Sequence, residues 1–152
     1  MSKPAMLKTF IWYPKDLGQV LDFYQGIFKE NMQVSDRNEL ANGEIFTSSF
    51  KIFDQEFIAM ATEGGAEFNY SISLHVMCDG QAEVDYYWDA LITDGGEPGN
   101  CGWLKDKFGL SWQVTPFQMG EHLGNPDPEA AQYAMNALRS MQKIVLADFV
   151  RA

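Results

Sequence analysis

The stretch CGWLKDKFGLSWQVTP, residues Cys101–Pro116, is the part of the sequence that decides the fold. It predicts a hairpin, with a strand at about 101–105, a turn over 106–109 and a second strand over 110–115 that ends at Pro116. The second strand alternates, with Ser111, Gln113 and Thr115 on one face and Leu110, Trp112 and Val114 on the other. Such a strand offers an apolar face to a core and a polar face to other contacts.

A strand and an amphipathic helix precede this hairpin. Residues 71–78 alternate as a strand, and the apolar residues after them recur at helical spacing. This stripe consists of Val84, Tyr87, Trp88, Leu91 and Ile92. The second half of the chain therefore begins with a strand and a helix that can pack on one sheet.

The same order of elements occurs earlier in the chain. Residues 7–13 are rich in β-branched and aromatic side chains and end at Pro14, after which Asp16 can cap a helix that runs to about Phe28. Strand-like runs follow near 32–35, 44–53 and 55–62. The first half therefore reads as strand, helix and three strands.

The two halves are related by an internal duplication. LDFY at 21–24 superposes on VDYY at 84–87, an offset of 63 residues, and the elements around both segments follow the same order. We expect one domain over 1–152, with a first βαβββ module at about 5–66 and a second at about 70–116. A helical extension covers about 117–152, where Asp127 can cap a helix.

Composition excludes several classes of partner. The 11 basic and 21 acidic residues give a net charge of −10, which repels nucleic acid and anionic lipid. Cys78 and Cys101 have no spacing typical of structural zinc, and Cys101 is either a reactive thiol or, more simply, a small buried side chain. The sequence has no apolar run of the length of a signal peptide or a membrane span. We expect a cytoplasmic protein.

The second half resembles a known family. DGQAEVDYYWDAL at 79–91 and CGWLKDKFGLSWQVTP at 101–116 are similar to the PhnB-like branch of the vicinal oxygen chelate superfamily, the superfamily of glyoxalase, bleomycin-resistance proteins and extradiol dioxygenases. This branch is labelled 3-demethylubiquinone-9 3-methyltransferase domain. The resemblance implies an α+β fold in which two βαβββ modules form a cupped eight-stranded mixed sheet, with a C-terminal helix. It also implies a homodimer.

Metal-using relatives such as glyoxalase I hold a metal with four ligands from the first and last strands of each module. Carried over to this sequence, the resemblance places these positions at Thr9, Ala59, Ser73 and Gln113. Hydroxyl, methyl and amide groups do not replace the anionic or imidazole ligands that a divalent cation usually needs. We therefore expect no tightly bound metal and no cofactor.

His75 is the candidate catalytic residue. Strand alternation places it on one face with Ser73 and Met77, where it can act as a general base or bind a ligand by a hydrogen bond. The alternative is a histidine that neighbouring polar groups satisfy. The predicted ligand-binding cavity is lined by Thr9, Ala59, Ser73, His75 and Gln113.

Four functions remain open. The first is a small-molecule-binding protein or metal-independent enzyme of unknown substrate. The second is a metal-dependent lyase, isomerase or dioxygenase whose ligands have moved to other positions, for example His75 with Glu63 and one further residue. The third, methyl transfer from S-adenosylmethionine, is disfavoured because no strand is followed by a glycine-rich turn that opens a helix. The fourth is a protein-binding role of the dimer surface.

Overall fold

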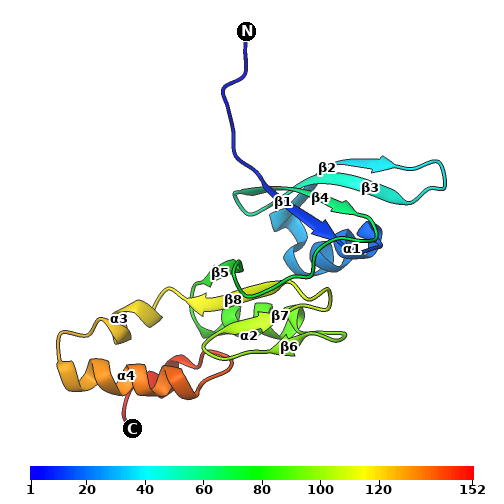
Figure 1. Cartoon of the computed structure of the whole chain (residues 1–152). Helices are drawn as coiled ribbons and strands as arrows, with labels where there is room; N and C mark the ends of the chain where they lie inside the picture. Colours follow the sequence, from blue (N-terminus) through cyan, green and yellow to red (C-terminus); the bar gives the residue numbers. More distant parts are fainter. The chain divides into compact units, whose positions relative to one another are not determined.

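The computed structural model describes residues 1–152 and contains the repeated order of strands and helix in both halves of the chain (Figure 1). The chain divides into two units, unit 1 at Met1–Glu67 and unit 2 at Phe68–Ala152, and each contains its own four-stranded mixed sheet. The α+β class, the two βαβββ modules and the C-terminal helix are confirmed.

Unit 1 contains five main elements. They are β1 (Thr9–Tyr13), α1 (Leu17–Phe28), β2 (Met32–Glu39), β3 (Ile45–Ile52) and β4 (Gln55–Ala61), with a short 3-10 helix at Lys29–Asn31. The sheet order is β1-β4-β3-β2, with β1 and β4 parallel and the other pairs antiparallel. The Asp16 side chain caps α1 by accepting a hydrogen bond from the Gln19 amide, as the sequence predicts.

The core of unit 1 lies between its sheet and α1. Ile11 and Tyr13 of β1 are buried on the same face as Phe57 and Ala59 of β4, and α1 contacts β3 and β4. Figure 1 shows α1 lying across one face of this sheet. The other face, which we call the far face of unit 1, carries the alternate residues of the same strands.

Unit 2 has the same plan and a longer C-terminal part. Its elements are β5 (Leu74–Cys78), α2 (Gln81–Leu91), β6 (Glu97–Pro98), β7 (Trp103–Lys105), β8 (Ser111–Pro116), α3 (Met119–Leu123), α4 (Pro128–Ser140) and a 3-10 helix at Leu146–Phe149. The sheet order is β5-β8-β7-β6, and β5 and β8 are parallel. No helix in residues 1–152 has the length and apolar character that crossing a bilayer requires.

The strand bounds differ from the predicted ones at a few positions. The strand predicted at 101–105 begins at Trp103, because Cys101 and Gly102 adopt left-handed backbone conformations with φ of 57° and 85°. The strand predicted at 71–78 begins at Leu74, and β2 continues to Glu39 along its pairing with β3. These differences change the ends of the elements and not their order.

A buried carboxylate, that of Asp106, stabilises the turn between β7 and β8. Asp106 is 2% exposed and accepts hydrogen bonds from the amides of Phe108 at 2.9 Å and Leu110 at 3.1 Å. Its second oxygen accepts a hydrogen bond of 2.8 Å from the indole nitrogen of Trp112. The carboxylate therefore joins the turn to the core of unit 2.

The C-terminal segment 141–149 is part of unit 2. The amides of Cys101 and Gly102 donate hydrogen bonds of 2.8 Å to the carbonyls of Met141 and Gln142. The Gln81 side chain donates to the Ile144 carbonyl and accepts from the Leu146 amide, both at 2.8 Å. Ile144 is fully buried, so this segment completes the core and does not extend freely from it.

Candidate ligand-binding face of unit 2

The strand register of unit 2 brings polar side chains of three strands together. His75 of β5 lies opposite Gln113 of β8, and Gln113 lies opposite Trp103 of β7. The alternate residues Val76, Leu104 and Trp112 are buried, and α2 contacts all three strands on that side. We call the face turned away from α2 the far face of unit 2, formed by Ser73, His75, Met77, Trp103, Lys105, Ser111, Gln113 and Thr115.

Hydrogen bonds join these side chains in pairs across β5 and β8. The Nε2 atom of His75 lies 2.6 Å from the Thr115 hydroxyl, and either group can be the donor, depending on the tautomer of the ring. The amide nitrogen of Gln113 donates to the Ser73 hydroxyl at 2.9 Å. The pairs hold the imidazole and the amide in defined orientations, which is a property of preorganised binding sites.

Ser111 differs from the other polar residues of this face. It is completely buried, and its hydroxyl has no hydrogen-bond partner in the protein. Leaving a buried polar group without a partner costs about 1–3 kcal/mol. Such a group in a stable protein calls for an explanation, and an additional molecule that bonds to it is one.

Burial places the pKa of the His75 imidazole below its ordinary value, because removing water disfavours the charged ring. The residue keeps an exposed surface, so this desolvation is partial. A lowered pKa favours the neutral ring at pH 7, and a neutral imidazole can accept a hydrogen bond or a proton.

This pKa shift predicts how stability depends on pH. In the unfolded chain His75 takes up a proton near its ordinary pKa of about 6.5, whereas the folded protein resists protonation to lower pH. The stability that His75 contributes is therefore present above about pH 6.5 and declines as the pH falls below it. Urea midpoints at pH 7.5 and 5.5 should differ less for His75→Gln than for the wild type, while His122→Gln serves as the control. An unchanged difference for His75→Gln would contradict the shift.

The predicted cavity residues fall into two groups. Ser73, His75 and Gln113 lie together on the far face of unit 2. Thr9 and Ala59 lie in unit 1, on the face that contacts α1: Ala59 is fully buried opposite Ile11, and Thr9 shares the face of Ile11. The structure therefore does not place these two side chains on the far face of unit 1.

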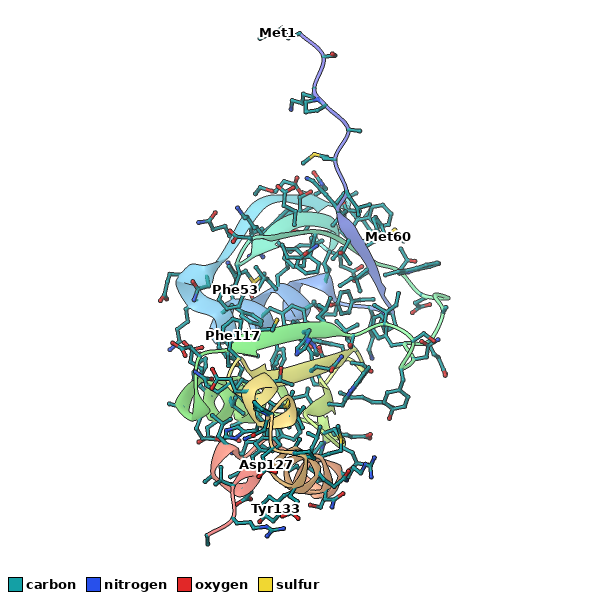
Figure 2. All side chains as sticks on the ribbon, turned by 90° about the vertical axis from the view of Figure 1, so that its left-hand side faces the viewer. Met1, Phe53, Met60, Phe117, Asp127 and Tyr133 are labelled. Atoms are coloured by element: carbon teal, nitrogen blue, oxygen red, sulfur yellow. The ribbon has the colours of Figure 1, made fainter.

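Other residues occupy the far face of unit 1 at the equivalent register. Phe10 lies opposite Ile58 in the parallel pair of β1 and β4, as His75 lies opposite Gln113 in the pair of β5 and β8. The next pair is Trp12 opposite Met60, which is labelled in Figure 2. Along the pair of β1 and β4 the far face of unit 1 is thus apolar and aromatic, whereas the pair of β5 and β8 carries polar side chains in unit 2.

These residues do not fit a divalent metal. The register positions in the first and last strands of the two units supply one imidazole, one amide and two hydrocarbon side chains, from His75, Gln113, Phe10 and Ile58. No group of three His, Cys, Asp or Glu residues in 1–152 is arranged to hold a metal ion. A stable site needs more nitrogen, sulfur or anionic oxygen ligands than this.

The chain also lacks the usual cradle for S-adenosylmethionine. The turns that lead from strand to helix are Pro14-Lys15-Asp16 in unit 1 and Asp79-Gly80 in unit 2, and neither is glycine-rich. The Gly80 amide is instead bonded to the side chain of Gln118 at 3.1 Å. The residues present therefore do not fit this cofactor in its usual binding mode.

The two cysteines have structural surroundings. Burial, with a smaller contribution from Glu83, raises the pKa of the Cys78 thiol to about 12, so this thiol is not a nucleophile at neutral pH. Cys101 is half-buried, and its sulfur lies 3.4 Å from the Leu138 carbonyl. Neither residue belongs to the far face of unit 2.

Lys105 and Trp103 are on this face but are not among the predicted site residues. Leu104 between them is 2% exposed and packs on the α2 side, so both neighbours point the other way. The alternation Trp103-Leu104-Lys105 is the sequence signal that indicates their position.

Comparisons with known proteins agree with this fold. Residues 5–115 match the family model described as 3-demethylubiquinone-9 3-methyltransferase. A solved structure described as a putative 3-demethylubiquinone-9 3-methyltransferase, PhnB protein, from Bacillus cereus is 23% identical, with a TM-score of 0.64 over 74% of this chain and 99% of that chain. A search of curated proteins gave no significant match.

Two further solved structures are similar. A protein from Pseudomonas aeruginosa is 14% identical, with a TM-score of 0.57 over 73% of this chain and 98% of that one. The fosfomycin resistance protein FosX from Listeria monocytogenes, complexed with Mn(II) and sulfate, is 19% identical, with a TM-score of 0.56 over 74% of this chain and 92% of that one. At these identities the likeness concerns the fold alone.

Proposed function

Because the chain belongs to the 3-demethylubiquinone-9 3-methyltransferase family, within the vicinal oxygen chelate superfamily, we propose that it binds a small organic molecule on the far face of unit 2 without a divalent metal. The observation that carries the proposal is the fully buried Ser111 hydroxyl, which has no partner among the polar side chains around it. A bound molecule that bonds to this oxygen removes the cost of leaving it unsatisfied.

The neighbouring residues supply the remaining contacts. The Gln113 amide can donate and accept hydrogen bonds, and the Ser73 hydroxyl that it bonds to fixes its direction. His75 provides a neutral ring that the Thr115 hydroxyl holds in place. If the ligand is also a substrate, His75 is the general base of the reaction, because it is the one imidazole on this face and its lowered pKa keeps the ring neutral at pH 7.

The metal-dependent alternative draws its support from the Mn(II) complex of FosX. That complex describes FosX, and here the far face of unit 2 offers a single imidazole and no carboxylate from β5 or β8. Methyl transfer rests on the family description alone, without a cradle for the methyl donor. Metal-free binding therefore accounts best for the side chains that are present.

We also infer a cytoplasmic homodimer. Two free cysteines, Cys78 and Cys101, support a reducing compartment. The exposed apolar side chains of unit 1, among them Phe10 at 55% and Trp12 at 39% exposure, support a second copy that covers them. Sedimentation velocity reports the assembly mass directly.

The binding proposal is tested by replacing the unpartnered serine. Ser111→Ala removes a hydroxyl that makes no bond in the protein, so we expect stability to stay unchanged or to rise by up to about 1 kcal/mol. The same variant loses one hydrogen bond to a ligand, which corresponds to about tenfold weaker binding. A fragment library followed by amide NMR shifts should produce its largest shifts at residues 73–77 and 111–115, and affinities for the same fragments should fall in the variant.

Ser48→Ala is the matched control. Ser48 is also completely buried, but its hydroxyl donates a 2.7 Å hydrogen bond to the Asp36 carbonyl in unit 1. This variant should lose about 1 kcal/mol of stability and leave fragment affinities unchanged. Shifts that avoid both segments argue against the proposal, as does saturable paramagnetic broadening around His75 when MnCl2 is added to chelator-free protein.

A further inference from the structure

Lys105 gives the far face of unit 2 a permanent positive charge. It lies opposite Ser111 in the antiparallel pair of β7 and β8, beside the buried hydroxyl that has no partner. Its ammonium group forms no ion pair, although Glu97 lies opposite it on the β6 side. The charge of this ammonium therefore remains available on a protein whose net charge is −10.

Two aromatic rings adjoin this charge. The Lys105 ammonium lies 4.7 Å from the centre of the Tyr70 ring, and the Tyr70 and Trp103 rings meet edge to face at 6.4 Å. Tyr70 is 64% exposed, so its cation–π contact with Lys105 leaves most of the side chain accessible to solvent. Exposed rings of this kind offer flat surfaces on which a planar molecule can stack.

The donors and the rings together indicate one class of ligand. The Lys105 ammonium and the Ser111 hydroxyl come from neighbouring strands at one register position, and both can donate to the same anionic oxygen. Trp103, next to Gln113 in the register, offers its ring on the same face. Resting on the proposed function, we infer that this face takes a planar aromatic or conjugated carboxylate, whose anionic end meets Lys105 and Ser111 and whose ring meets Trp103.

A pair of probes with the same ring separates charge from shape. We would titrate the full-length protein with 2-naphthoate and with 2-naphthamide at low salt, following the Trp103 indole resonance and the amides of 73–77 and 111–115. The carboxylate should bind at least about tenfold more tightly than the amide, and salt should reduce the difference. In Lys105→Gln the two probes should bind with equal affinity.

Lys107→Gln is the control for overall charge. Lys107 lies in the hairpin turn, with its ammonium 5.7 Å from the Phe108 ring. Its replacement by glutamine removes the same charge as Lys105→Gln, but from a position off the far face. This variant should keep the preference for 2-naphthoate, and Trp103→Leu should weaken the binding of both probes. Urea midpoints of all variants establish that each one folds.

Failure of this inference is distinct from failure of the proposed function. If 2-naphthamide binds as tightly as 2-naphthoate and shifts the far face, the carboxylate class is wrong while binding at this face stands. An equal loss of preference in Lys107→Gln likewise overturns the role of Lys105. If neither probe shifts the far face, the inference fails, and the fragment titration separately decides the proposed function.

Discussion

Asp106→Ala is expected to lower the free energy of unfolding by about 2–4 kcal/mol, because it removes the acceptor of three hydrogen bonds, two of them buried. The amides of Phe108 and Leu110 and the indole N–H of Trp112 all point at this carboxylate, and truncation leaves these donors unsatisfied. Asp106→Asn should cost nearly as much, since one of its two positions becomes a donor that faces another donor. Urea denaturation followed by tryptophan fluorescence measures the loss.

A double-mutant cycle with Trp112→Phe isolates the indole contact. The phenylalanine keeps a ring in the core but removes the 2.8 Å hydrogen bond to Asp106. The two substitutions together should cost less than the sum of the single effects by about 1 kcal/mol or more. Additive effects would show that the carboxylate acts through the turn alone. A loss below about 0.5 kcal/mol for Asp106→Ala would contradict its structural role altogether.

The sequence predicted the order of the elements because that order depends on local patterns. The alternation over 110–115 and the helical stripe that begins at Val84 are properties of neighbouring residues. The hydrogen bond between the Asp106 carboxylate and Trp112, in contrast, does not follow from a local sequence pattern. Trp112 follows six residues later, across the turn, and only the folded hairpin brings its indole nitrogen to the carboxylate.

The same distinction explains the candidate site. Strand alternation predicts that Ser73 and His75 share one face, because a period of two needs no information beyond the strand. In the structure His75 of β5 lies opposite Gln113, and Ser73, just before β5, accepts a hydrogen bond from the same Gln113 side chain. Thr9 comes from aligning the strand and helix junctions of the two halves, as Ser73 does, and Ala59 is the position that the fourth strand of the first module offers. The junctions differ by one residue, and a shift of one residue exchanges the two faces of a strand.

The two copies of the duplicated module carry different side chains at equivalent positions of their sheets. At the same register, unit 1 pairs Phe10 with Ile58, and unit 2 pairs His75 with Gln113. In the pair formed by the first and last strands, the hydrogen-bonding and proton-accepting groups are therefore concentrated in unit 2. This asymmetry argues against a symmetrical ligand set shared by the two copies, and it makes unit 2 the place where substitutions should change ligand binding.

Ile144→Ala is expected to lower the free energy of unfolding by about 2–5 kcal/mol, although it lies beyond residue 115, where the match to the family model ends. The side chain is fully buried, and a methyl group added to Gly102 would lie only 3.2 Å from it. The neighbouring backbone is held by Gln81 through two hydrogen bonds. Truncation thus opens a cavity in unit 2 that anchored surroundings cannot close.

Ile72→Ala provides the matched control, because Ile72 belongs to the same unit and is 72% exposed. It should change the free energy of unfolding by less than about 0.5 kcal/mol. Gln81→Ala should destabilise the protein in the same direction as Ile144→Ala, and the two effects should be coupled because both act on one segment. Equal small effects of Ile144→Ala and Ile72→Ala in urea denaturation would mean that segment 141–149 is dispensable. A large effect confined to Ile144 would instead extend the folding unit well past the part of the chain that defines the family.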